Sequence, residues 1–124
     1  MKARVIVIDD QEPIRRIIRR ALEHEGYEVL EASDGEKGVD LLRRNGAALV
    51  ITDIFMPGQD GIQTLRQIRK EFPGVKVIAM SGGGVTGQDL TQGAELLGAA
   101  RTLDKPFTTR DVVGLVEAVL QGRP

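Results

Sequence analysis

Five strand-like segments alternate with helix-like segments along this chain of 124 residues, and this alternation restricts the fold more than any other feature of the sequence. Runs rich in Val, Ile, Leu and Ala predict strands at residues 4–8, 28–32, 48–52, 75–80 and 100–103. Apolar residues at helical spacing predict helices within residues 13–25, 35–42, 62–72, 88–97 and 108–121. Because strand–helix–strand connections are right-handed, the alternation predicts one parallel sheet with helices on both of its faces.

The predicted fold class is therefore α/β: a three-layer, flavodoxin-like (βα)5 fold whose parallel five-stranded sheet has the order 2-1-3-4-5, with helices on both faces. No change of composition divides the chain, so residues 1–124 are predicted to form a single domain. In sheets of this kind, ligands bind beyond the carboxyl ends of the strands, where the strand order reverses. The residues that follow the strands are therefore the first candidates for a functional site.

Composition excludes several classes of function. The 17 basic and 18 acidic side chains give a formal net charge of −1, so there is no basic surplus for direct binding of nucleic acid. The chain has no cysteine, which excludes disulfides and thiolate-bound zinc. No apolar run has the length of a membrane span, and residues 1–4 lack the pattern of a signal peptide. We therefore expect a cytoplasmic protein that does not contact a membrane.

Polar residues follow four of the predicted strands. Asp9 and Asp10 follow the first strand, Asp53 the third, Ser81 the fourth and Lys105 the fifth. In the strand order 2-1-3-4-5 these four strands are neighbours, so we expect the side chains to meet at one edge of the sheet.

Such a group of acids predicts a cation. Two carboxylates about 4 Å apart repel each other by roughly 4 kcal/mol at an effective dielectric constant near 20, and one lysine offsets only part of the repulsion among three. Hard oxygen ligands favour Mg²⁺ over zinc. A cation beside a carboxylate, together with an ammonium group and a hydroxyl group, is suited to phosphoryl transfer.

Four motifs carry a resemblance to a known family: Asp9-Asp10, residues 53–61 with the sequence DIFMPGQDG, Ser81, and Lys105-Pro106-Phe107. They resemble the signature of response-regulator (CheY-like) receiver domains of bacterial two-component signalling, and the resemblance covers the whole chain. It implies a signalling switch rather than an enzyme that acts on a small substrate. The phosphoryl group would come from a sensor histidine kinase or a phosphotransfer protein, and phosphorylation would change the binding of an unknown downstream protein.

The resemblance also implies roles for individual residues. Asp53 would be the phosphoacceptor. Mg²⁺ would be bound by the carboxylates of Asp10 and Asp53 and by the backbone carbonyl of Phe55, and Asp9 would assist from beside the ion or through water. Lys105 would pair with one phosphoryl oxygen.

Ser81 would donate a hydrogen bond to another phosphoryl oxygen, and the Lys105–Pro106 peptide resembles one that is cis in this family. Family members often carry Tyr or Phe three residues before this lysine, where the present chain has Thr102. Because that aromatic side chain is missing, our hypothesis is that the glycine-rich loop at residues 82–84 carries the conformational change.

The first predicted helix carries a cluster of basic residues that form either a solvated face or a docking face for a partner. The segment 99–101 lacks the paired acids common in dimerising family members, so we expect a monomer or a weak dimer. The cluster consists of Arg15, Arg16, Arg19 and Arg20. The residues expected to dock a kinase with them are Ile14, Ile17 and Ile18.

Two other functions fit parts of the sequence. Residues 82–87, GGGVTG, match the dinucleotide-binding pattern G-x-G-x-x-G after a strand. That pattern usually occupies the first strand–helix turn, where this chain carries Asp9 and Asp10, which would repel a pyrophosphate. A phosphatase of the haloacid dehalogenase type would need a second acid two residues after its aspartyl nucleophile, and Phe55 occupies that position.

Overall fold

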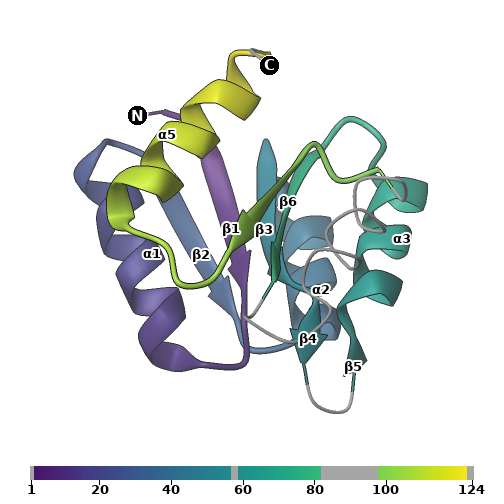
Figure 1. The fold of residues 1–124 in the computed structure, drawn as a ribbon. Coiled ribbons are helices and arrows are strands. Elements are labelled where there is room, and N and C mark those ends of the chain that lie inside the picture. Colours follow the sequence, from purple (N-terminus) through teal and green to yellow (C-terminus); the bar gives the residue numbers. More distant parts are fainter. Residues whose placement is uncertain (1, 57–58, 82–97, 123–124) are drawn as a thin grey trace.

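The computed structural model describes residues 2–56, 59–81 and 98–122 of the chain. A five-stranded parallel sheet with the order β2-β1-β3-β6-β7 forms the centre of the molecule (Figure 1). This is the predicted order 2-1-3-4-5, since β6 and β7 are the fourth and fifth strands of this sheet in chain order. The strands are β1 (Arg4–Ile8), β2 (Glu28–Ala32), β3 (Leu49–Asp53), β6 (Lys76–Ser81) and β7 (Arg101–Asp104).

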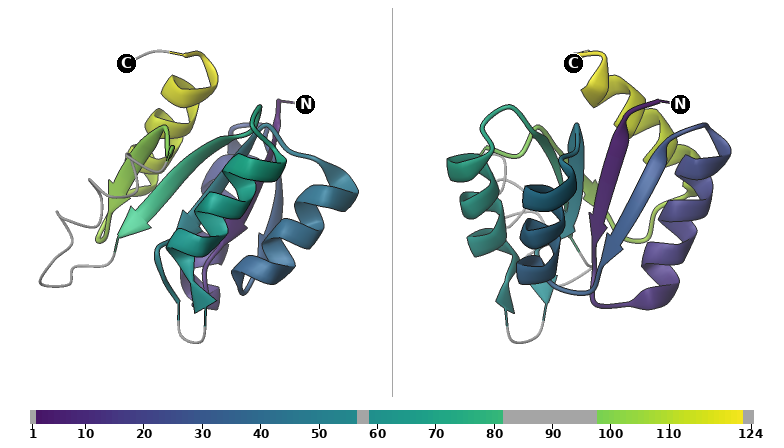
Figure 2. Two further views of the ribbon diagram at one scale, coloured as in Figure 1. Left: turned by 90° about the vertical axis from the view of Figure 1, so that its right-hand side faces the viewer. Right: turned by 180° about the vertical axis from the view of Figure 1, so that it is seen from behind.

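Helices cover both faces of the sheet, which confirms the three predicted layers (Figure 2). On one face lie α1 (Glu12–His24) and α5 (Thr109–Leu120), and on the other lie α2 (Gly35–Asn45) and α3 (Gly61–Glu71). The glycine-rich loop at 82–84 and the helix predicted at 88–97 fall outside the described residues. None of the described helices is long and apolar enough to cross a membrane.

Strand β1 shows why the central strands are continuous apolar runs. Its side chains alternate between the two faces, so that Val5 and Val7 pack with α1 and α5, whereas Ile6 and Ile8 pack with α2 and α3. All four side chains are fully buried. A strand covered on both faces has no solvent-facing position, and this explains why residues 5–8 of β1 are all apolar.

The boundaries of three strands differ from the prediction by one residue. β3, β6 and β7 each begin and end one residue later than expected. The ladder pairs Asp53 with Met80 and Ser81 with Asp104, so Asp53 and Ser81 are the last residues of their strands rather than the first residues after them. Their backbones are therefore held by the hydrogen bonds of the sheet.

The segment after β3 was predicted as a loop, but it contains a short antiparallel hairpin of β4 (Phe55–Met56) and β5 (Gln59–Asp60). α3 begins directly after this hairpin at Gly61. A Cβ atom at Gly61 would lie 2.4 Å from the Asp53 carbonyl oxygen, closer than any side chain allows. Glycine at this position therefore lets the helix start against the backbone that carries Asp53.

Candidate functional site

The three predicted carboxylates meet at the carboxyl edge of the sheet. β1 and β3 pair with Ile8 beside Thr52, so the residues that follow them, Asp9 and Asp53, lie next to each other. One carboxylate oxygen from each of Asp9, Asp10 and Asp53 lies within 4.8 Å of the others. Asp9 and Asp53 are buried, whereas Asp10 is exposed. The cluster is therefore open to solvent on the side of Asp10.

Lys105 joins two of these acids. Its Nζ donates hydrogen bonds to Asp9 Oδ2 at 2.9 Å and to Asp53 Oδ2 at 3.0 Å. Burial lowers the pKa of Lys105, but the hydrogen bonds to Asp9 and Asp53 and the charges of both carboxylates outweigh burial, so the pKa lies above its ordinary value. The lysine is therefore charged at neutral pH. The Lys105–Pro106 peptide bond is cis, which confirms the expectation from the sequence.

The Asp9 carboxylate has a donor at each oxygen. Oδ2 accepts from Lys105, and Oδ1 accepts from the Gln11 backbone N–H at 2.8 Å. The backbone N–H of Asp9 donates to the Ala32 carbonyl oxygen at 3.1 Å. Asp9 is thus held firmly in place, as suits a carboxylate that assists beside a cation.

Ser81 and Phe55 lie on neighbouring segments. The Ser81 side chain is buried, and its carbonyl oxygen accepts a hydrogen bond from the Lys105 backbone N–H at 2.8 Å. Phe55 begins β4 two residues after Asp53, and binding of a cation by its backbone carbonyl stays a prediction. Thr102 lies in β7, paired with Ala79 of β6, and is partly exposed. The expected residues are therefore gathered at one edge, with Thr102 in place of an aromatic residue.

The charge of the cluster fits a divalent cation. Three carboxylates and one ammonium group leave a surplus of two negative charges within a small volume. Carboxylates about 4 Å apart repel by roughly 4 kcal/mol at an effective dielectric constant near 20. One divalent cation would offset the surplus, and carboxylate oxygens are ligands that suit Mg²⁺. The residues present therefore fit the ion predicted from the sequence.

Arg15 was predicted only as a member of the basic docking cluster on the first helix, but the structure places it at the site. Its Nη1 donates to the Asp9 carbonyl oxygen at 2.7 Å, and its Nε donates to Glu31 Oε1 at 3.1 Å. In the sequence, nothing distinguishes Arg15 from the three other arginines of the cluster. Only its place in the first turn of α1, beside the loop that carries Asp9, gives it this contact.

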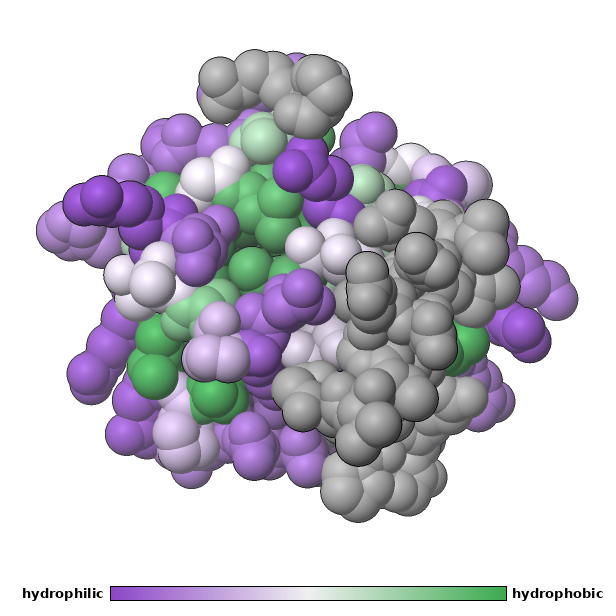
Figure 3. Space-filling view, in the orientation of Figure 1, coloured by the Kyte–Doolittle hydropathy of each residue, from purple (hydrophilic) through white to green (hydrophobic). Residues whose placement is uncertain are grey.

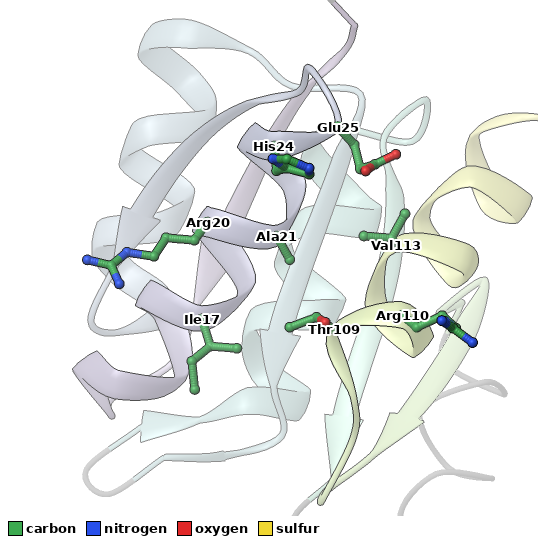
Figure 4. Close-up of a pocket in the computed structure, with 8 residues that line it drawn as sticks. All are labelled: Ile17, Arg20, Ala21, His24, Glu25, Thr109, Arg110 and Val113. Carbon is green, nitrogen blue, oxygen red and sulfur yellow. The ribbon is translucent and has the colours of Figure 1, made fainter.

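A groove of about 640 Å³ lies between α1 and α5. Figure 4 shows that Arg20 and Arg110 extend in opposite directions, with Ala21 and Val113 between them. In Figure 3, hydrophobic surface (green) lies between hydrophilic residues (purple) on the side of the molecule where α1 and α5 are found. The lining residues are Ile17, Arg20, Ala21, His24, Glu25, Thr109, Arg110 and Val113.

The isoleucines of α1 do not share one environment. Ile17 is 48% exposed and lines the groove, whereas Ile14 is partly buried. The expectation that Ile18 takes part in docking is wrong, because its side chain is fully buried against the sheet. Ile17 is the one large hydrophobic side chain of this helix that is exposed.

Comparison with known proteins identifies the family. The model of the response regulator receiver domain matches residues 5–117. The receiver domain of NtrX from Brucella abortus is 28% identical, with a TM-score of 0.89 over 94% of this chain and 98% of that one. A response regulator receiver domain protein from Clostridium thermocellum is 35% identical, with a TM-score of 0.86 over 98% of this chain and 97% of that one. A longer NtrX chain from Brucella abortus is 29% identical with a TM-score of 0.93, and this chain spans 28% of its length.

The chain therefore belongs to the response regulator receiver domain family. Receiver domains are phosphoacceptor switches in two-component signalling, and they interact with histidine kinases or phosphotransfer partners. The cluster of Asp9, Asp10 and Asp53 is compatible with the Mg²⁺ site typical of such domains.

Proposed function

We propose that this protein is a Mg²⁺-dependent switch in which Asp53 accepts the phosphoryl group. The observation that carries the proposal is the cluster in which Asp53 Oδ2 lies 3.0 Å from Lys105 Nζ and an Asp53 oxygen lies within 4.8 Å of oxygens of Asp9 and Asp10. Asp53 also ends a central strand, so the reacting carboxylate is attached to a rigid backbone.

In the proposed transfer, an Asp53 carboxylate oxygen attacks the phosphorus atom of a phosphohistidine in the partner. The phosphorus–nitrogen bond breaks, the histidine nitrogen keeps the electron pair and takes a proton from solvent, and Asp53 becomes an acyl phosphate. Bound Mg²⁺ would neutralise charge on the phosphoryl oxygens. The carboxylates of Asp10 and Asp53 and the carbonyl of Phe55 would hold the ion, with Asp9 assisting.

Lys105 and Ser81 act on the phosphoryl oxygens in this proposal. Lys105 already faces Asp53, so its ammonium group would pair with an oxygen of the group bound there. The Ser81 hydroxyl group would donate a hydrogen bond to a second phosphoryl oxygen. Water then attacks the phosphorus, the bond to the Asp53 oxygen breaks, and inorganic phosphate leaves. The domain is thereby reset, and binding of a downstream protein differs between the two states.

Intact-mass spectrometry after incubation with acetyl phosphate and Mg²⁺ tests this function. We expect one phosphoryl adduct on the wild-type protein, no adduct on Asp53→Asn, and no adduct in the presence of a chelator. A wild-type protein that takes up no phosphoryl group under these conditions would refute the proposal.

We further propose that a helix of the phosphohistidine-bearing partner docks in the groove between α1 and α5. α1 begins two residues after Asp10, and α5 begins four residues after Lys105, so both helices that line the groove start near the site. Its apolar centre and the basic side chains of Arg20 and Arg110 suit a helix that carries apolar residues flanked by acids.

Variants of the groove separate docking from chemistry. We expect Arg20→Glu and Ile17→Ala to slow transfer from the kinase by about tenfold, since each removes an exposed contact of the interface. Labelling by acetyl phosphate should be unchanged, because neither residue contacts the carboxylates. Equal losses with both donors would exclude docking in the groove. Arg15 is unsuitable for this test because it contacts Asp9.

A further inference from the structure

Arg15 connects the loop after β1 to the end of β2. Its Nε donates to Glu31 Oε1 at 3.1 Å, while its Nη1 donates to the Asp9 carbonyl oxygen at 2.7 Å. The side chains of Arg15 and Glu31 are only 15% and 22% exposed. Because a guanidinium group is a planar fork with several donors, it makes both contacts at once at a fixed separation, which the single ammonium group of a lysine does not reproduce.

The Asp9 backbone is thereby held on both sides. Its N–H donates to Ala32 in β2, and its carbonyl oxygen is held through Arg15 by Glu31 of the same strand. The peptide group between Asp9 and Asp10 is planar, so the position of the Asp9 carbonyl oxygen also fixes the positions of the Asp10 backbone N and Cα atoms. Among the described residues, no hydrogen bond to the Asp10 carboxylate is found, and its direction therefore depends on the backbone.

From this geometry we infer that Arg15, oriented by Glu31, is a positioning residue that holds the Asp9–Asp10 segment in the conformation that binds a divalent cation. The inference rests on the proposed Mg²⁺-dependent function. Groups that orient metal ligands without touching the metal commonly alter metal affinity by about 10-fold to 100-fold when they are removed. Arg15 would orient Asp10 in this way, because it holds the peptide group that precedes the Asp10 Cα atom.

A second arginine provides a matched control at the other end of the same two strands. Arg4 Nε donates to Glu28 Oε2 at 2.7 Å, and Arg4 Nη1 donates to the Asn45 carbonyl oxygen. Arg4 and Glu28 are paired residues of β1 and β2. Substitution of Arg4 therefore removes the same two kinds of contact without altering the segment that carries the carboxylates.

The sign of the effect on Mg²⁺ affinity distinguishes positioning from simple electrostatics. Arg15 carries a positive charge next to the site, and this charge by itself repels a cation. If charge were its only influence, Arg15→Ala would tighten Mg²⁺ binding and Arg15→Lys would leave it unchanged. If Arg15 positions Asp10, both variants weaken binding.

The first measurement needs no metal. Backbone ¹⁵N relaxation of the metal-free protein reports the order of the Asp10 and Gln11 amides. We expect lower order at both amides in Arg15→Lys and in Glu31→Gln, which keeps a hydrogen-bond acceptor but loses the charge that attracts the guanidinium group. Arg4→Lys should match the wild type at these amides. Unchanged order in both site variants would overturn the inference, even if the wild-type protein proved not to bind Mg²⁺.

The second measurement is the dissociation constant for Mg²⁺, from isothermal titration calorimetry of the full chain. We expect it to rise about tenfold in Arg15→Lys and Arg15→Ala and to stay unchanged in Arg4→Lys. Tighter or equal binding in the Arg15 variants would overturn the inference. Absence of binding by the wild type would instead count against the proposed function, and the relaxation measurement would then decide the role of Arg15 alone.

Discussion

The two ends of the central sheet carry charges in different arrangements. At the amino ends of β1 and β2, Arg4 pairs with Glu28, one cation with one anion. At the carboxyl ends, Asp9, Asp10 and Asp53 form a cluster of three carboxylates beside the one ammonium group of Lys105, which pairs with Asp9 and Asp53. The first arrangement is electrically balanced and partly exposed, whereas the second is unbalanced and largely buried.

This difference shows how one sheet separates stability from function. A balanced, exposed ion pair contributes at most about 1 kcal/mol and attracts no ligand. The unbalanced cluster opposes folding through repulsion, and the same repulsion favours binding of a cation. Between the two ends, apolar side chains are buried on both faces of the sheet. Their burial offsets the repulsion among the carboxylates.

Two glycines give the largest expected contrast between the ends. A Cβ atom at Gly61, beside Asp53, would lie 2.4 Å from a backbone oxygen, whereas a Cβ atom at Gly74, before β6, would meet no atom within 4 Å. We expect Gly61→Ala to lower the free energy of unfolding by about 3 kcal/mol and Gly74→Ala to change it by less than about 1 kcal/mol. Urea denaturation measures both values, and equal values would contradict the contrast.

Mg²⁺ should stabilise the protein through the carboxyl end alone. At a concentration about 100 times its dissociation constant, a ligand that binds only the folded state adds about 2.7 kcal/mol. We expect this gain in wild type and in Arg4→Lys, its loss on addition of a chelator, and its absence in Asp10→Asn. Thermal unfolding with and without Mg²⁺ measures the gain, and an equal gain in Asp10→Asn would remove Asp10 from the site.

Neutralising an acid should have opposite effects at the two ends in the absence of metal. Asp10→Asn removes an exposed carboxylate from a cluster with a negative surplus, so we expect the free energy of unfolding to rise by about 1 kcal/mol. Glu28→Gln removes the partner of Arg4, so we expect a loss of less than about 1 kcal/mol. The comparison fails if urea denaturation in chelator shows the two changes with the same sign.

Alkaline pH should lower the free energy of unfolding of the metal-free protein, by less than the changes predicted above. The pKa of Lys105 is raised in the folded state, so its contribution is complete below the unfolded value of about 10.4 and is lost as the pH rises through the folded-state pKa. Tyr27, next to β2, has a pKa raised by burial and by the charges of Glu117 and Glu25, and it acts in the same direction.

The two contributions are separated by substitution. In a Tyr27→Phe background, stability measured by urea denaturation should still fall above about pH 10.4. The further change Lys105→Met should remove most of that fall. If the decline persisted without Lys105, the carboxyl end would not be its source.

Much of the fold followed from local pattern. The boundaries of β1 and β2 agree with the prediction, because β1 is an apolar run that ends at two acids and β2 ends directly before the turn residues 33–35. Asp9, Asp10, Asp53 and Lys105 were identified because parallel strands bring their carboxyl ends to one edge.

Other features depended on contacts between distant segments. β3 and β6 extend one residue further than expected because their ladders continue through Asp53 and Ser81. The hairpin after β3 is a local feature formed by pairing of Phe55 with Asp60, but its strands are too short for an alternating pattern to indicate them. Ile17 and Ile18 both fit the helical spacing of apolar residues, but the position of α1 on the sheet buries Ile18 and leaves Ile17 exposed.

The sequence by itself determined the class of fold, the single edge at which the acids collect and the family to which the chain belongs. These properties rest on periodicity and on residue types, which act locally and can be read along the chain. The tertiary structure alone decided which arginine of α1 holds Asp9, which isoleucine faces solvent and where the strands end. Each of these depends on how helices, strands and loops pack in three dimensions, and helical or strand period does not contain that information.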